Sequence, residues 1–185
     1  MRNHGLSQKD VNDKLTRIIK KDTNFNSGKI FGSMCTTPHS FSQKIYSKYL
    51  EKNIGDPGLI LGTQKLENDS IRMIGSLLSY PDAIGNVVSG GTEANIIALW
   101  TARNYSNTSN AEVILPSHSH HSFDKAADIL GLKLIKIPSK NGIMDVNHIE
   151  KKITRNTILM IGVAGNTPLG LIDPIDELSD LVFCF

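Results

Sequence analysis

Cysteine, aromatic residues and unbalanced charge are all scarce in this 185-residue sequence. The two cysteines, Cys35 and Cys184, lie far apart with no CxxC or Cys/His spacing, which argues against a disulfide framework or a structural zinc site and favours a reducing, cytoplasmic setting. The formal net charge is only +2, so no nucleic-acid partner is expected.

Long hydrophobic runs are missing as well. The most apolar stretch, residues 157–165, is far too short to span a bilayer, and the polar first ten residues lack the apolar core of a signal peptide. We therefore expect a soluble protein with no membrane partner. Hydrophobic residues make up 39% of the chain, which suffices for a domain with a real core.

The hydrophobic pattern changes along the chain. The first part predicts helices over residues 7–20, 40–53 and 64–78, with a buried stripe on the last of them formed by Leu66, Ile71, Ile74, Leu77 and Leu78. After that, short apolar runs alternate with helical segments. The expected strands are residues 84–88, 112–115, 132–137 and 157–163, the last of them buried on both faces.

Alternating strands and helices predict an α/β fold with a mostly parallel sheet, flanking helices and ligand-binding loops at the carboxyl ends of the strands. Asp145 is expected to cap a helix that runs through Ile153, and Asp173 with Pro174 to start a final helix. Three loops should converge on a site: residues 89–92, 117–122 and 165–170.

The first loop, Ser89-Gly90-Gly91-Thr92, passes from a predicted strand into a helix through small residues. Backbone amides and the helix dipole can there bind an anion, and a phosphate is the natural ligand. The loop lacks the GK[ST] ending of a nucleotide P-loop and the GxGxxG of a dinucleotide fold. A tight turn with no ligand remains the alternative interpretation.

The second loop contains His118, His120 and His121. Zinc is disfavoured because no cysteine and only one nearby carboxylate, Asp124, could complete a tetrahedral set, so no metal is expected. A single histidine turned inward, with the others in solvent, could stack on a planar heteroaromatic ligand or move a proton.

The third loop, residues 165–170, offers the amide of Asn166 and the hydroxyl of Thr167 just past a buried strand. Both groups suit hydrogen bonds to the polar edge of a ligand. A plain Gly/Pro turn is the alternative interpretation.

Taken together, the motifs SGGTEAN (residues 89–95), HHSFDKA (120–126) and GNTPLGLID (165–173) resemble those of group II pyridoxal-phosphate-dependent decarboxylases. The upstream segments FGSMC (31–35) and NIGDPGL (53–59) resemble the archaeal L-tyrosine/L-aspartate decarboxylases within that family. The resemblance keeps the order and spacing of the motifs over nearly the whole chain.

This resemblance implies the large domain of a fold-type-I, aspartate-aminotransferase-like enzyme. Residues 61–185 would be part of that domain, and residues 1–60 an N-terminal helical and loop segment on the dimer and substrate side. The implied protein is a homodimer that decarboxylates an L-amino acid with pyridoxal 5'-phosphate. Tyramine for methanofuran synthesis or β-alanine for coenzyme A would be the product.

The resemblance also assigns residues to roles. Gly91 and Thr92 would hold the cofactor phosphate, and His120 would stack on the pyridine ring. Asn166 and Thr167 would make polar contacts near that ring. The substrate side would be bordered by four residues of the upstream segments: Ser33, Met34, Gly58 and Leu59.

Such an enzyme also needs a Schiff-base lysine and a carboxylate on the pyridinium nitrogen. In the family both lie beyond the point that corresponds to residue 185, and residues 181–185 no longer resemble the family. A frameshift, a premature stop or a fragment would look like this. Two alternatives stay open: a catalytically inactive remnant, and another fold-type-I lyase that shares the glycine and histidine loops.

Overall fold

The chain divides into two compact units, residues 1–70 and residues 71–185. The computed structural model describes residues 5–33, 35–56 and 58–183. The division after residue 60 that the family resemblance implies stays a prediction.

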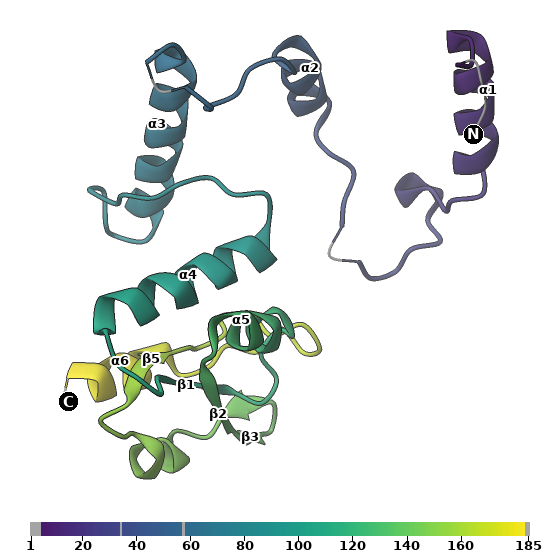
Figure 1. The fold of residues 1–185 in the computed structure, drawn as a ribbon. Helices are drawn as coiled ribbons and strands as arrows, with labels where there is room; N and C mark the ends of the chain where they lie inside the picture. Colours follow the sequence, from purple (N-terminus) through teal and green to yellow (C-terminus); the bar gives the residue numbers. More distant parts are fainter. Residues whose placement is uncertain (1–4, 34, 57, 184–185) are drawn as a thin grey trace. The chain divides into compact units, whose positions relative to one another are not determined.

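The first unit is helical (Figure 1). It contains α1 (Gln8–Ile19), the short 3-10 helix η1 (Phe25–Ser27), α2 (Ser40–Lys48) and the beginning of α3 (Leu61–Leu77). Ser7 caps α1 by accepting a hydrogen bond from the Asp10 amide at 3.1 Å. None of the residues of α1 is buried, although its sequence has an apolar side.

Helix α3 begins at Leu61, three residues before the predicted start, and its predicted buried stripe is wrong. Leu66, Ile74 and Leu77 are 67%, 55% and 85% exposed. The buried residue of α3 is Gly75, where a Cβ would lie only 2.3 Å from the Tyr80 carbonyl oxygen as the chain turns back. Among the described residues, no helix is long and apolar enough to cross a membrane.

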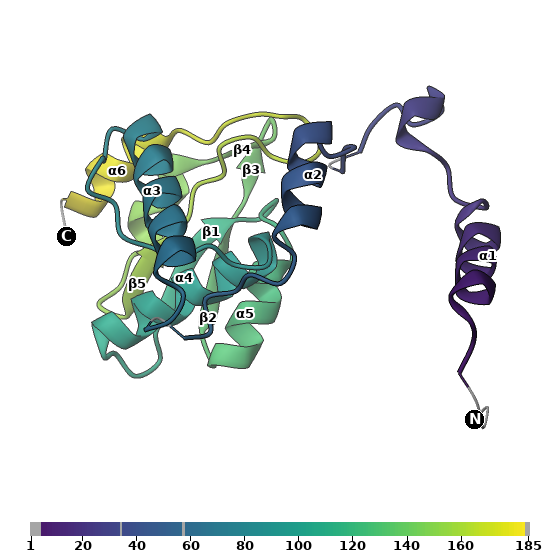
Figure 2. The same cartoon turned by 90° about the horizontal axis from the view of Figure 1, so that it is seen from above.

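A three-stranded parallel sheet organises the second unit (Figure 2). Its strand order is β2 (Lys133–Ile137), β1 (Glu112–Pro116) and β5 (Thr157–Met160). The predicted strand at residues 84–88 is wrong: no described strand pairs with this segment, and Ile84 is 99% exposed. Strand β5 ends at Met160 and is half-buried, because it forms an edge of the sheet instead of its middle.

All five residues of the central strand β1 are buried because both faces of the sheet are covered. Successive side chains of a strand point to opposite faces. Leu115 joins a cluster with side chains of α4 (Gly91–Ser106) and α5 (Ser122–Leu130), whose buried members are Leu99, Phe123 and Ala126. Ile114 joins the cluster of the other face, with Ile137, Met144, Ile149 and Leu178.

The layers are visible in Figure 1, where α4 and α5 lie on one side of the strands and the segment with residues 146–152 on the other. Helix α6 (Ile175–Phe183) supplies Leu178 to this second side. The observed architecture is therefore a parallel sheet with flanking helices, as the sequence predicts.

One predicted helix is replaced by tighter turns. After the antiparallel pair β3 (Ser139–Lys140) and β4 (Ile143–Met144), the chain forms two 3-10 helices, η2 (Val146–His148) and η3 (Glu150–Lys152). The predicted α-helix through Ile153 is wrong, since Val, Asn, His and Ile are weak helix formers. The predicted cap is confirmed: Asp145 accepts a hydrogen bond from the Asn147 amide at 3.2 Å.

Glu112, at the start of β1, generates a prediction about pH. Lys133 donates to its Oε1 at 2.7 Å and Thr154 to its Oε2 at 2.6 Å, and these hydrogen bonds, Lys133 first, hold the pKa of Glu112 below its ordinary value of 4.5. A carboxylate whose pKa is depressed on folding stabilises the protein above its unfolded pKa and loses that contribution as the pH falls through the folded pKa. The urea midpoint of the wild type should therefore fall as the pH is lowered below 4.5. We expect this fall to be smaller in Glu112→Gln, which has no carboxylate to protonate at this position. Glu150→Gln, on exposed η3, is the control, and equal slopes for wild type and Glu112→Gln would contradict the prediction.

Candidate functional site

The loop before α4 leaves backbone amides open to an anion. Gly90 caps the helix without any side-chain hydrogen bond, and the amides of Gly91 and Thr92 donate to no acceptor among the described residues. A Cβ placed on Gly90 or Gly91 would meet no atom within 4 Å, so the space over the helix start is open. These features fit a phosphate group, because free amides and the helix dipole both attract negative charge.

Glu93 holds the start of this loop through hydrogen bonds to Ser89. Its Oε2 accepts hydrogen bonds from the Ser89 hydroxyl at 2.6 Å and the Ser89 amide at 2.8 Å. These two bonds, the hydroxyl first, lower the pKa of Glu93, so the carboxylate stays ionised near the positive end of the helix. The bonds fold residues 89–93 back onto the helix and leave Gly91 and Thr92 free.

The histidine loop separates its three imidazoles. His118 is the one turned inward, with 14% of its side chain exposed, while His120 and His121 are exposed. The expectation of one inward histidine is confirmed, although His120, which the family resemblance places on the cofactor ring, is not that residue. The rings of His120 and His121 lie 4.1 Å apart at a tilt of 38°. The ring of His121 therefore packs against the ring of His120.

Ser122 connects the histidine loop, residues 117–122, to the helix that follows the candidate phosphate loop, residues 89–92. Its hydroxyl lies 2.8 Å from His120 Nδ1 and accepts a hydrogen bond from Asn95 Nδ2 at 2.8 Å. Asn95 lies on α4, one turn after Gly91, whereas Ser122 is the first residue of α5. The sequence motifs around Gly91 and His120 are thus brought together by a direct side-chain contact.

The third loop uses its asparagine for structure. Asn166 is buried, donates from Nδ2 to the Gly142 carbonyl at 2.7 Å and accepts at Oδ1 from the Leu169 amide at 2.9 Å. Thr167 is exposed, and its hydroxyl has no partner among the described residues. The polar role near the cofactor that the resemblance gives to both residues stays a prediction, and Thr167 is the one with a free group to fulfil it.

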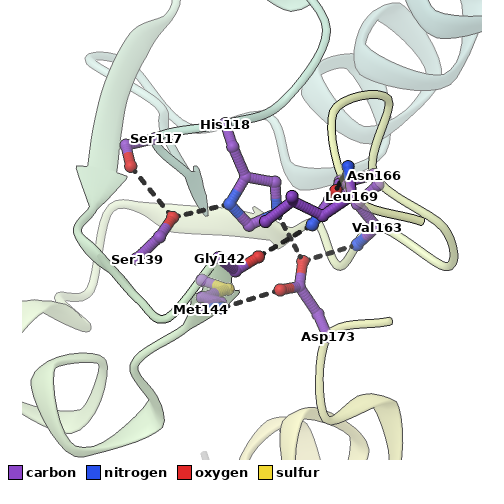
Figure 3. A network of polar contacts seen from close by, with 9 residues as sticks. All are labelled: Ser117, His118, Ser139, Gly142, Met144, Val163, Asn166, Leu169 and Asp173. Atoms are coloured by element: carbon purple, nitrogen blue, oxygen red, sulfur yellow. Dashed lines mark hydrogen bonds and ion pairs between the residues drawn. The ribbon is translucent and has the colours of Figure 1, made fainter. Parts of the chain in front are cut away.

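Asp173 holds the loops around the sheet together (Figure 3). Its fully buried carboxylate accepts hydrogen bonds from the Met144 amide at 2.7 Å and the Val163 amide at 2.8 Å. The final helix, α6, begins at Ile175 near its predicted start, but the prediction that Asp173 caps it is wrong, because the carboxylate accepts from Met144 and Val163 and from no described amide of α6. An acidic residue set among Leu171, Ile172 and Pro174 was the available sign that it is buried.

His118 connects the same network to β3. Its Nε2 lies 3.4 Å from Asp173 Oδ2, and its Nδ1 lies 2.6 Å from the Ser139 hydroxyl. Ser139 in turn contacts the Ser117 hydroxyl at 3.1 Å. Figure 3 shows these contacts and the separate Asn166 bridge gathered at the ends of β1 and β5. The contacts of His118 thus link the loop that carries His120 to β3 and to Asp173.

The predicted substrate-side residues lie in the first unit. Ser33 Oγ accepts a hydrogen bond from the Cys35 amide at 3.0 Å, and the Gly58 amide donates to Asp56 Oδ1 at 2.9 Å. Leu59 is 78% exposed, and Met34 lies outside the described residues. Their place next to a substrate stays a prediction. In the described part of the chain, no three His, Cys, Asp or Glu side chains are grouped closely enough to hold a metal ion.

The Asp173 network makes a stability prediction. Asp173→Asn replaces one carboxylate oxygen by a donor that faces a backbone amide, so one buried amide loses its acceptor. We expect a loss of about 2–3 kcal/mol of unfolding free energy. Urea unfolding followed by circular dichroism measures it.

Asp176→Asn on the exposed side of α6 is the matched control for this substitution and should change stability by less than about 0.5 kcal/mol. Equal stabilities of the two variants would show that Asp173 does not hold the loops.

Comparison with known proteins identifies the family of this chain. The Aminotransferase class-V model matches residues 84–182, which contain the three loops. L-aspartate decarboxylase of Thermococcus kodakarensis is 46% identical over 178 residues, or 96% of this chain and 46% of that protein. Probable L-tyrosine/L-aspartate decarboxylase of Methanothermobacter thermautotrophicus is 48% identical over 158 residues, or 85% of this chain and 44% of that protein.

Solved structures agree on the fold. Sphingosine-1-phosphate lyase of Burkholderia pseudomallei superimposes with a TM-score of 0.86 at 23% identity and covers 99% of this chain and 46% of its own. Oryza sativa TDC, solved with PLP and tryptamine, gives 0.83 at 16% identity, covering 100% of this chain and 45% of its own. Both are fold-type-I enzymes, so the second unit is part of that fold.

The chain spans about half the length of the curated relatives it matches. The phosphate loop, the histidine loop and the sheet that joins them all fall inside the matched region. The chain therefore belongs to the class-V aminotransferase family of pyridoxal-phosphate-dependent enzymes, where it resembles the group II amino-acid decarboxylases.

Proposed function

We propose that this chain forms the phosphate-binding and ring-stacking part of an L-amino-acid decarboxylase that uses pyridoxal 5'-phosphate. L-Aspartate, L-tyrosine or both are the proposed substrates, with β-alanine or tyramine as products. The observation that carries the proposal is the 46–48% identity to proteins named as aspartate or tyrosine/aspartate decarboxylases over 85–96% of the chain. The contact between the phosphate and histidine loops supports it.

Each loop has a distinct task in this proposal. The amides of Gly91 and Thr92 and the Thr92 hydroxyl bind the phosphate, since they have no partner among the described residues. His120 stacks on the pyridine ring, and Thr167 offers a hydroxyl to a polar edge. When bound, pyridoxal phosphate supplies an electron sink for the charge left by departing CO2.

Binding is measured first, on the 185-residue chain. We expect pyridoxal phosphate to bind reversibly and to be displaced by inorganic phosphate. Thr92→Val keeps the shape of the side chain but removes the hydroxyl, so its Kd should rise about tenfold or more. Thr101→Val, farther along the exposed side of α4, is the matched control and should bind like wild type. Equal loss in both variants, or no binding, would contradict the proposed phosphate site.

Activity is the second part of the same test. We expect CO2 release from L-aspartate or L-tyrosine from the polypeptide that also carries the Schiff-base lysine, found by sequencing the gene beyond codon 185. Borohydride trapping of the cofactor on that polypeptide would support the proposal. If no downstream reading frame encodes the lysine, the alternative of a non-catalytic chain with weak, borohydride-insensitive cofactor binding is favoured instead.

We also propose a homodimer in the cytoplasm. The apolar side of α1 supports the dimer, because Leu15, Ile18 and Ile19 are about half exposed and nothing else in the described part of residues 1–70 covers them. The exposed free thiol of Cys35 suits a reducing compartment. Sedimentation equilibrium should show a dimer for wild type and for Lys14→Glu, and a weakened dimer for Leu15→Glu. A monomeric wild type would contradict the dimer.

A further inference from the structure

A short chain of hydrogen bonds from α4 determines what the His120 ring can do. Asn95 Nδ2 donates to Ser122 Oγ at 2.8 Å, and Ser122 Oγ lies 2.8 Å from His120 Nδ1. The Ser122 backbone amide also points at Nδ1, at 3.2 Å. Ser122 is fully buried, so its hydroxyl cannot turn to water instead.

The donors in this chain can be counted. The amide nitrogen of Asn95 is only a donor, so Ser122 Oγ accepts there and keeps its single proton for another partner. A backbone N–H is also only a donor. The Ser122 backbone amide therefore needs a lone pair on His120 Nδ1, so Nδ1 is the nitrogen without a proton, and the Ser122 hydroxyl, whose oxygen already accepts from Asn95, donates to it. The neutral ring then carries its proton on Nε2.

We propose that Asn95 and Ser122 are positioning residues that lock His120 in the tautomer protonated on Nε2. In this state Nδ1 is saturated by donors, and Nε2 has no partner among the described residues. The neutral imidazole in this tautomer can then donate one hydrogen bond from Nε2, to an acceptor such as a carboxylate oxygen. His120 thus acts as a hydrogen-bond donor and stacking group.

The same bonds set the distance between the two halves of the proposed cofactor site. Asn95 follows the phosphate loop by one helical turn, and His120 precedes Ser122 by two residues. A shift of α4 relative to the histidine loop would therefore break the Asn95–Ser122 hydrogen bond. This part of the inference rests on the proposed function, whereas the tautomer is a property of the chain alone.

The tautomer is measured on the 185-residue chain without cofactor. Two-bond proton–nitrogen correlation spectra of the chain labelled with 15N-histidine, at about pH 8 where an ordinary imidazole is neutral, distinguish the two ring nitrogens. His120→Gln identifies the His120 signals by their loss. We expect a single population with the proton on Nε2, and a population with the proton on Nδ1 or a mixture of both would overturn the proposal without any other variant.

Asn95→Asp tests the origin of the lock. The new carboxylate is similar in size but accepts the Ser122 hydroxyl proton, so a fraction of His120 should move its proton to Nδ1. Asn104→Asp adds the same charge on the same helix, where Asn104 accepts only from its neighbour Arg103, and should leave the tautomer unchanged. Ser122→Ala should also produce a mixture. An unchanged His120 in both Asn95→Asp and Ser122→Ala would overturn the role of these residues.

Binding separates this inference from the proposed function. Pyridoxal phosphate should bind about fivefold to tenfold more weakly to Asn95→Asp than to Asn104→Asp, because the Ser122 hydroxyl then donates to the new carboxylate and no longer holds the His120 ring through Nδ1. Equal binding by these two variants would overturn the positioning role. If wild type shows the Nε2 tautomer but binds no pyridoxal phosphate, the proposed function fails and the lock remains.

Discussion

The buried carboxylate of Asp173 is the interaction on which the arrangement of the loops depends. It accepts hydrogen bonds from the backbone amides of Met144 in β4 and of Val163 after β5. His118, from the loop after β1, lies beside it. Backbone amides removed from water need acceptors, and a buried carboxylate needs donors, so each group makes the burial of the other tolerable. Three segments that are far apart in sequence are thereby held at one end of the sheet.

The second tie joins this end of the sheet to α4. Hydrophobic packing of Leu99, Phe123 and Ala126 against Leu115 brings α4 and α5 onto the same face, but such packing is not directional. The hydrogen bond between Asn95 and Ser122 adds a defined geometry. Packing therefore places the phosphate and histidine loops near one another, and polar contacts fix their orientation.

Burial is unequal along the chain. Strand β1 is enclosed on both faces, whereas β5 at the sheet edge and the apolar residues of α1 and α3 remain partly or largely exposed. A parallel strand is fully buried only when other strands flank it on both sides. The apolar side of an amphipathic helix is buried only when it packs against another surface. The loops of the candidate site start from the enclosed strand β1 and its flanking helices, although His120 and Thr167 are themselves exposed.

The sequence by itself determined what depends on neighbouring residues. The presence of helices near residues 7–20, 40–53 and 64–78, the parallel α/β pattern, the Asp145 cap and the free glycine loop before α4 follow from local spacing, and the three motifs identified the family. Periodicity marks which side of a helix is apolar, but it cannot say what covers that side, so the expected burial of α3 was wrong.

Tertiary structure decided every feature that needs a partner distant in sequence. Residues 84–88 have the composition of a strand but find no described strand to pair with. The sequence predicts that Asp173 caps a helix, but in the folded chain its carboxylate accepts hydrogen bonds from the Met144 and Val163 amides. The three histidines look alike in sequence, and only contacts with Ser139 and Asp173, or with Ser122, distinguish the inward His118 from the available His120. Hydrogen bonds are short-ranged and directional, so their partners are known only once the chain has folded.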